Sequence, residues 1–180
     1  MPETTTLSDL RDWLTAFEEN QRHVIEGAEA RIVFHEPESP TKTRQVVLAI
    51  HGFSACRQET APISQHLAQR FHANLVEIRL AGHGMAQLGM TASAEDWLQS
   101  VVDGYDIASR LGDQVTMVST STGSPLACWA DRHLRDAYGA PHAHLFMAPN
   151  FKINNPFDFV LTMPWARTLV PLLLGKERSW

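Results

Sequence analysis

Between residues 29 and 149, short apolar runs typical of β-strands alternate with apolar residues at helical spacing. Short apolar runs predict β-strands over residues 29–36, 44–50, 73–80, 114–119 and 143–149. Apolar residues at helical spacing predict amphipathic helices over residues 60–72, 93–111 and 124–139. Strands that alternate with helices of these lengths predict the α/β class, with a mostly parallel sheet and helices on both of its faces.

The predicted helices carry apolar stripes and end signals. The stripes are Ile63, Leu67 and Phe71 in one helix, and Trp97, Val101, Tyr105 and Ala108 in the next. Ser93 and Asp96 are spaced as a capping box at the start of the second of these helices. Gly112 is expected to end it in a left-handed conformation.

A further amphipathic helix is predicted near the N-terminus, within residues 1–25, and we expect it to lie on the fold that follows. Thr6 and Asp9 are placed as its capping pair. Its apolar positions are Leu7, Leu10, Leu14 and Phe17. The expected organisation is this helix, a core over residues 26–150 and a separate segment over residues 151–180.

The composition narrows the class of protein. A chain of 180 residues is most simply one domain. Its mild acidity, with a formal net charge of −5, and the lack of a basic run argue against a nucleic-acid partner. Cys56 and Cys128 have no motif spacing and the start has no secretory signal, so free thiols in the cytoplasm are expected. Two prolines and an arginine interrupt the apolar residues 159–175, which argues against a membrane span. Nothing indicates the oligomeric state.

Small polar residues follow three of the predicted strands. They are "HGFSA" after residue 50, "AGHGM" after residue 80, and "TSTGS" after residue 119. Because ligands bind beyond the carboxyl ends of the strands in an open parallel sheet, we expect these three segments to converge on one rim.

Ser121 is the strongest candidate nucleophile. It lies at a strand-to-helix junction, with the small residues Ser119 and Gly123 two positions before and after it. A nucleophile elbow needs this pattern so that strand and helix can approach closely, and the helix start favours an oxyanion. The alternative is that Ser121 is an ordinary helix cap.

The sequence resembles the α/β-hydrolase family, in particular its carboxylesterase and monoacylglycerol-lipase-like branch with serine-aminopeptidase-type sequences. The matching segments are "VVLAIHGFSA", "LVEIRLAGHG", "SAEDWLQSVVDGYDIASRLGDQVTMVSTSTG" and "HLFMAPN", which cover residues 30–150 in the family's order. Ser119 departs from the pattern, because the family more often has glycine there.

The resemblance implies a role for each matching residue. Ser121 would attack an acyl carbonyl, and the backbone N–H groups of Phe53 and Thr122 would form the oxyanion hole. His51 and Gly52 would shape the loop after the strand, and "GHG" at 82–84 would be a structural turn. The substrate would be a small-molecule acyl ester, with no metal and no cofactor.

A serine needs a base, and in this family the acid and the histidine follow the serine in chain order. After Ser121 come His133, well along a helix, and His142 and His144, at the start of a strand, so none is expected to reach it. "HAH" at 142–144 lacks a third metal ligand and fits paired surface histidines better than a metal site.

The remaining candidates for acid and base are weak. His51 and His83 lie on the expected rim but would need a new arrangement, and Asp158 fits a solvated loop carboxylate better than a catalytic acid. The acid and base are therefore expected C-terminal to this chain, which resembles an amino-terminal portion truncated before the last strands. Residues 151–180 resemble the start of the cap over the site. Two hypotheses follow: a serine ester hydrolase, or a non-catalytic or decayed binding protein of the same fold.

Overall fold

The computed structural model describes residues 6–86 and 92–152. The chain divides into two units, Met1–Asn150 and Phe151–Trp180. Of the second unit only residues 151–152 are described, so the expected cap segment and Asp158 lie outside the described residues. The fold below is that of the first unit.

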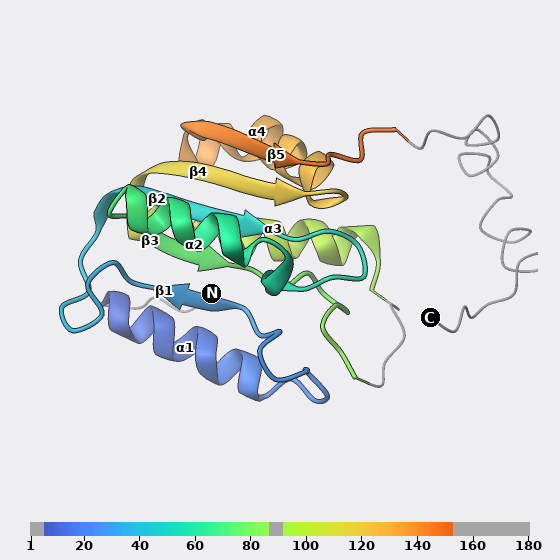
Figure 1. Cartoon of the computed structure of the whole chain (residues 1–180), viewed down its shortest axis with the longest axis horizontal. Helices are drawn as coiled ribbons and strands as arrows, with labels where there is room; N and C mark the ends of the chain where they lie inside the picture. The colour runs from blue at the N-terminus through green and yellow to red at the C-terminus, as the bar shows by residue number, and fades with distance from the viewer. Residues whose placement is uncertain (1–5, 87–91, 153–180) are drawn as a thin grey trace, which may run out of the picture. The chain divides into compact units, whose positions relative to one another are not determined.

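The described residues of the first unit form one five-stranded sheet with helices on both faces (Figure 1). The strands are β1 (Arg31–Val33), β2 (Thr43–Ile50), β3 (Asn74–Glu77), β4 (Gly112–Thr120) and β5 (Ala143–Met147). Their order is β1-β3-β2-β4-β5, and only β1 is antiparallel to its neighbour. The mostly parallel sheet predicted from the sequence is confirmed.

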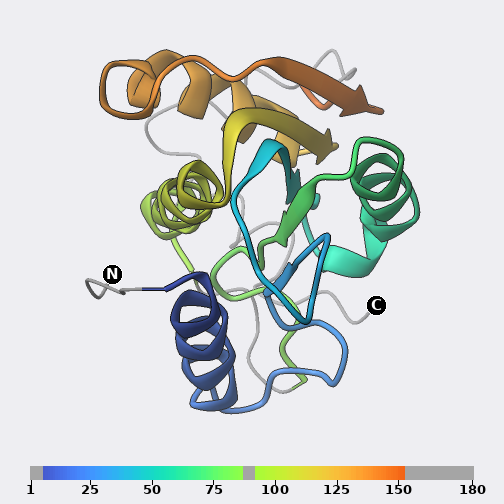
Figure 2. The same ribbon diagram turned by 90° about the vertical axis from the view of Figure 1, so that its left-hand side faces the viewer.

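Two apolar clusters cover the two faces of the sheet. The helices are α1 (Leu7–Glu19), α2 (Ala61–Arg70), α3 (Ala94–Leu111) and α4 (Gly123–Tyr138), with a short 3₁₀ helix η1 (Arg57–Glu59). Val46, Leu48 and Ile50 of β2 belong to a cluster with residues of α1, α3 and α4, whereas Val47 and Ala49 belong to a cluster with Ala68 of α2. Figure 2 shows α2 on the opposite side of the sheet from α1 and α3. β2 is therefore buried on both faces, as its apolar run predicts.

Both predicted capping boxes are confirmed. The Thr6 hydroxyl accepts from the Asp9 N–H at the start of α1, and the Ser93 hydroxyl accepts from the Asp96 N–H at the start of α3. Each aspartate side chain accepts from the N–H of its capping partner in return. These bonds satisfy N–H groups that the first turn of a helix leaves free.

The prediction for Gly112 was wrong. Gly112 is extended, with φ −156°, and begins β4 instead of forming a left-handed cap. A Cβ at this position would lie 2.7 Å from the Val46 Cβ and 2.9 Å from the Val46 nitrogen. Glycine is needed here because β2 and β4 approach closely, and not because of a positive φ.

The predicted stripe of α2 was wrong at Ile63 and Phe71, whereas Leu67 packs against the apolar cluster on its face of the sheet as predicted. Ile63 and Phe71 are 42% and 46% exposed, and the buried residues of this helix are Ser64 and Ala68. Small side chains let α2 lie close to the sheet, where the Ser64 hydroxyl donates to the buried carboxylate of Glu77 at 3.3 Å. The buried carboxylate of Glu77 thus gives the polar side chain of Ser64 a partner on the inward face of α2.

Three strands are shorter than predicted, β5 only by its last two residues. β1 ends at Val33, and the His35 N–H donates to the side-chain oxygen of Asn74 at 2.9 Å instead of continuing a ladder. β3 ends at Glu77, before the turn that contains Gly82 and Gly84. The side chain of Asn74 is buried, so this bond also satisfies a buried polar group.

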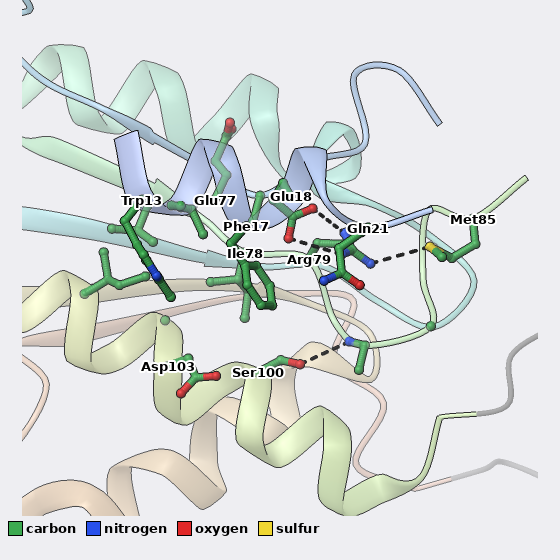
Figure 3. Close-up of a pocket in the computed structure, with 17 residues that line it drawn as sticks. Trp13, Phe17, Glu18, Gln21, Glu77, Ile78, Arg79, Met85, Ser100 and Asp103 are labelled. Atoms are coloured by element: carbon green, nitrogen blue, oxygen red, sulfur yellow. Dashed lines mark hydrogen bonds and ion pairs between the residues drawn. The ribbon is translucent and has the colours of Figure 1, made fainter. Parts of the chain in front are cut away.

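A buried ion pair ties α1 to the segment after β3. Arg79 donates to both carboxylate oxygens of Glu18, at 2.7 and 3.1 Å, and its remaining terminal nitrogen donates to the His83 carbonyl at 3.2 Å. The pair borders a cavity of about 330 Å³ between α1, β3 and α3 (Figure 3). The N-terminal helix is therefore linked to the turn that contains His83.

Removal of one partner of this pair should destabilise the fold strongly. Glu18→Ala leaves the Arg79 charge buried without its partner, which typically costs about 3 kcal/mol. Urea unfolding followed by circular dichroism measures this loss. Glu19→Ala, at the exposed neighbouring position, is the matched control and should change stability by less than about 0.5 kcal/mol. Equal stability of the two variants would contradict the role of the pair.

Candidate active site

The carboxyl ends of β2, β3 and β4 meet at one edge of the sheet, as predicted (Figure 1). A Cβ built on Gly52, after β2, would lie 3.0 Å from the Ser121 Cβ, after β4. The rings of His51 and His83 have centroids 5.1 Å apart, which joins the loop after β2 to the turn after β3. All three segments therefore contribute to one rim.

Ser121 has a left-handed backbone conformation, with φ +48°. This conformation is uncommon for a residue with a side chain and is kept only where neighbouring structure holds it. Its N–H donates to the Met147 carbonyl at 3.1 Å, and its carbonyl accepts from the N–H groups of Ser124 and Asn150 at 3.1 Å each. The end of β5 and the residues after it thus hold the bend at Ser121.

The Ser121 hydroxyl is not used as a helix cap. The N-cap residue of α4 is Thr122, and no side-chain hydrogen bond caps this helix. Within the described residues the Ser121 hydroxyl makes no hydrogen bond. The ordinary capping role considered as the alternative is therefore not what the structure shows.

Small residues around the bend allow strand and helix to meet. A Cβ on Gly123 would lie 2.5 Å from the Ile50 carbonyl oxygen and 2.7 Å from the His51 carbonyl oxygen. Ser119 is fully buried, and its hydroxyl lies 3.3 Å from the Ser124 hydroxyl. The serine that replaces the family's usual glycine is accommodated because Ser124 provides a polar partner.

His51 bridges two loops with its buried ring. Its Nδ1 lies 2.8 Å from the Gly52 carbonyl oxygen, and its Nε2 accepts from the Leu80 N–H at 3.0 Å. Because Nε2 is an acceptor, the proton belongs on Nδ1 and the ring is neutral. Burial lowers the pKa of His51 to about 4. Both nitrogens are thus occupied by the main chain, which fits a structural role better than proton transfer.

Phe53 and Thr122 have unused backbone donors. Neither N–H makes a hydrogen bond to the described part of the chain. The Phe53 side chain is 52% exposed, and its ring contacts the rings of His83 and Trp97 at centroid distances of 5.9 and 5.8 Å.

The turn after β3 is glycine-dependent, as expected for "GHG". Gly82 and Gly84 have φ of +74° and +65°. Between them, the buried His83 lies 3.1 Å from the Ala81 carbonyl oxygen through Nδ1, while its Nε2 has no partner among the described residues. Burial lowers the pKa of His83. The ring therefore presents an unshared acceptor nitrogen beside Phe53 and Trp97.

The later histidines lie away from Ser121. His133 is exposed on α4, and its Nδ1 is bonded to the Trp129 carbonyl oxygen of the same helix. His144 is paired in register with Met117, four residues before Ser121, which corresponds to roughly 13 Å along a strand. His142 precedes it, and its N–H donates to the Val115 carbonyl.

The structure adds Glu59 to the site, which the sequence analysis missed. Its carboxylate accepts from the Gly52 N–H at 2.7 Å and lies 3.1 Å from the position that a Gly52 Cβ would occupy. Glu59 belongs to η1, seven residues after Gly52. No spacing signal could have identified it, because the contact arises from how the chain turns back.

Among residues 6–86 and 92–152, no group of three or more His, Cys, Asp or Glu side chains could hold a metal ion. In the same part of the chain, no helix is long and apolar enough to cross a membrane.

Comparison with known proteins supports the fold. No family model and no curated protein matches the sequence. A solved structure described with LipS and LipT, two metagenome-derived lipolytic enzymes, matches with a TM-score of 0.64 and 22% identity, over 78% of this chain and 54% of that one. The chain thus spans about half the length of that protein. This similarity shows a common fold.

Two more distant structures are also similar. MenH from S. aureus has a TM-score of 0.49 and 15% identity, over 70% of this chain and 44% of that one. Esterase B from Lactobacillus rhamnosis has a TM-score of 0.45 and 14% identity, over 94% of this chain and 64% of that one.

Gly123→Ala should destabilise the protein by about 1–3 kcal/mol, because the new Cβ meets the main-chain oxygens of Ile50 and His51, which cannot rotate away. Urea unfolding measures the loss. Cys128→Ala, at an exposed position of the same helix, is the control and should stay within about 0.5 kcal/mol of the unchanged protein. A Gly123→Ala variant as stable as this control would contradict the close approach.

The low pKa of His51 predicts a loss of stability in acid. His51 stays neutral in the fold down to about pH 4, while the unfolded chain takes up a proton below pH 6.5. Its contribution is complete above pH 6.5 and declines between pH 6.5 and 4, by on the order of 3 kcal/mol. His83, which faces it, contributes in the same direction because its pKa is also lowered.

This pH dependence is measured by urea unfolding between pH 7 and pH 4.5. His51→Gln should be less stable at pH 7 and should lose less stability on acidification than the unchanged protein. His133→Gln, at an exposed histidine, should follow the unchanged protein. Parallel curves for His51→Gln and the unchanged protein would disprove the assignment.

Proposed function

We propose that this chain, which has the α/β-hydrolase fold that its sequence resembles, acts as a serine ester hydrolase with Ser121 as the nucleophile. The observation that carries the proposal is the left-handed Ser121 at the junction of β4 and α4, beside the Gly52 loop, with a hydroxyl that makes no hydrogen bond to the described residues. A nucleophile elbow has this geometry, because the strained turn directs the serine oxygen away from its own helix.

The proposed oxyanion hole consists of the Phe53 and Thr122 N–H groups. Two features support it: both donors are free of partners among the described residues, and Thr122 stands at the N-terminus of α4, where the helix dipole favours negative charge. His51, Gly52, Ser119 and Gly123 would act by shaping the rim, since they fix the loop and allow the close approach of β2 and α4.

The reaction would proceed in two steps. The Ser121 oxygen attacks the acyl carbon while a base takes its proton, and the carbonyl oxygen becomes an oxyanion between the Phe53 and Thr122 amides. Return of the electron pair expels the alcohol, which receives the proton and leaves an acyl-serine. Water, activated by the same base, then releases the carboxylic acid and regenerates Ser121.

The base and its acid partner belong, in this proposal, to residues C-terminal to this sequence. No described histidine is hydrogen-bonded to the Ser121 hydroxyl: His51 has both nitrogens bonded to the main chain, and His133 and His144 lie elsewhere in the fold. The match to only 54% of a lipolytic enzyme is consistent with a longer protein. The substrate class, a small-molecule acyl ester, rests on this similarity and on the proposed elbow.

The second candidate is a binding protein of the same fold that lacks a catalytic triad. The observation that favours it is that, among the described residues, no histidine is hydrogen-bonded to the Ser121 hydroxyl. The gene sequence beyond the Trp180 codon distinguishes the two. An in-frame continuation with further strands, an Asp or Glu and a His supports the hydrolase, and a stop codon supports the binding protein.

Labelling by a fluorophosphonate tests the nucleophile. In the full-length product of the gene we expect mass spectrometry to locate the adduct on Ser121, and Ser121→Ala should abolish both labelling and ester hydrolysis, because the attacking oxygen is gone. Ser109→Ala, on α3 with its hydroxyl bonded to the Asp106 carbonyl, is the matched control and should be labelled normally. Undiminished hydrolysis by Ser121→Ala would refute the proposal.

A further inference from the structure

We propose that Glu59 is a positioning residue for the oxyanion hole, which it serves by holding the Gly52 N–H and so fixing the loop that carries the Phe53 N–H. The hydrogen bond from the Gly52 nitrogen to the Glu59 carboxylate is 2.7 Å long, as expected for a charge-assisted bond. This inference rests on the proposed function, because it assigns a role within the same site.

The argument begins with the two peptide units that meet at Gly52. The first ends in the Gly52 N–H, which donates to Glu59. The second contains the Gly52 carbonyl, which lies 2.8 Å from His51 Nδ1, and the Phe53 N–H, which points opposite to that carbonyl because the peptide is planar and trans. Glu59 and His51 together therefore hold both planes, and this sets the direction of the Phe53 donor.

Glycine would otherwise be the most mobile point of this loop, since it lacks a side chain that restricts its backbone. A side chain cannot replace it, because a Cβ at this position would meet the Ser121 Cβ at 3.0 Å and the Glu59 carboxylate at 3.1 Å. The loop needs a glycine for space, and it then needs partners from outside to keep the glycine in one conformation. Glu59 provides one of these partners.

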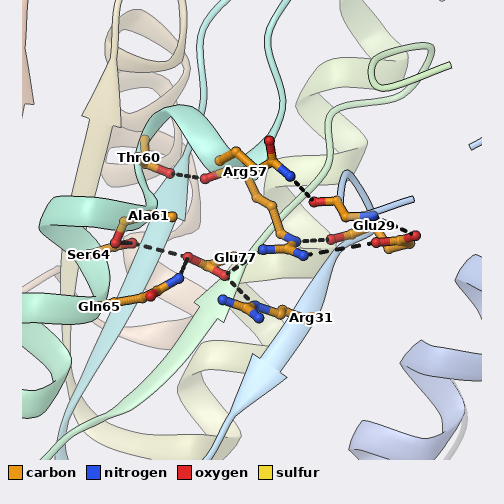
Figure 4. Close-up of polar contacts among 10 residues, drawn as sticks. Glu29, Arg31, Arg57, Thr60, Ala61, Ser64, Gln65 and Glu77 are labelled. Atoms are coloured by element: carbon orange, nitrogen blue, oxygen red, sulfur yellow. Dashed lines mark hydrogen bonds and ion pairs between the residues drawn. The ribbon is translucent and has the colours of Figure 1, made fainter. Parts of the chain in front are cut away.

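Glu59 itself comes from a firmly anchored turn. Arg57, at the start of η1, lies 3.6 Å from the Glu77 carboxylate and donates to the Glu29 carbonyl at 2.8 Å (Figure 4). Gln58 donates to the Gly27 carbonyl at 3.2 Å. Glu77 is fully buried and is also paired with Arg31, so the anchor lies in the interior.

The charge of Glu59 is not used in an ion pair with any described residue, whereas Arg57 in the same turn is paired twice. The carboxylate is thus committed to the Gly52 N–H. A positioning role requires an acceptor at this place but no negative charge, and no proton transfer. This distinction separates the proposal from a role as general base and from a purely electrostatic effect.

Glu59→Gln and Glu59→Ala test the proposal, because a glutamine carbonyl can still accept the Gly52 N–H and a methyl group cannot. Two quantities are measured in the full-length protein: hydrogen exchange of the Gly52 amide by NMR, and the rate constant of fluorophosphonate labelling at Ser121. Glu38→Ala removes an exposed carboxylate elsewhere and is the control. It should leave both quantities unchanged.

We expect Glu59→Ala to expose the Gly52 amide to hydrogen exchange. We also expect labelling of Ser121 to slow by about tenfold or more, which is less than the effect of removing an oxyanion-hole donor altogether. Glu59→Gln should keep the amide protected and label within about twofold of the unchanged protein. Slow labelling of Glu59→Gln with a protected Gly52 amide would overturn the proposal, since the charge or a proton transfer would then be what matters. Unchanged exchange in Glu59→Ala would also overturn it.

The experiment distinguishes failure of the proposed function from failure of the proposed role of Glu59. If Ser121 is not labelled in the unchanged protein, the nucleophile assignment fails, and with it a catalytic purpose for the loop. The exchange measurement still decides whether Glu59 holds Gly52, because it does not depend on any reaction. Protection that is lost in Glu59→Ala and kept in Glu59→Gln would then support the loop anchor alone.

Discussion

The close approach of α4 to the end of β2 is the constraint on which the rim of this protein depends. No Cβ fits at Gly123, because the carbonyl oxygens of Ile50 and His51 occupy that space. The helix can begin directly behind the strand, and Ser121 must then take a left-handed conformation to connect β4 to it. The bend at Ser121 thus lies where two parallel strands and one helix pack closely through their backbones.

The loops around this bend are held mainly by main-chain hydrogen bonds. Met147 and Asn150 bond the peptide groups of Ser121, and the His51 ring joins Gly52 to Leu80. A neutral histidine suits this task because it can donate with one nitrogen and accept with the other, and burial keeps it neutral by disfavouring the imidazolium. Conformations that would be strained or mobile in a free peptide are therefore kept in one geometry.

Buried charges occupy a second layer behind the rim. The Glu18–Arg79 pair connects α1 to the turn that contains His83, and Glu77 with Arg57 and Arg31 anchors η1. Isolated buried charges would be costly, but paired and hydrogen-bonded ones can orient the segments that carry them. The N-terminal helix and η1 thus support the rim without contributing to it directly, apart from Glu59.

The sequence by itself determined the order of elements, the parallel sheet and the rim segments, because spacing and strand-end chemistry are local properties of the chain. Burial on both faces of β2, both capping boxes and the position of Ser121 after β4 all followed from such local patterns. Only the tertiary structure decided the role of Gly112, the inward face of α2 and the contact between Glu59 and Gly52. Each depends on which distant backbone or buried carboxylate lies opposite, and a pattern of neighbouring residues carries no information about that.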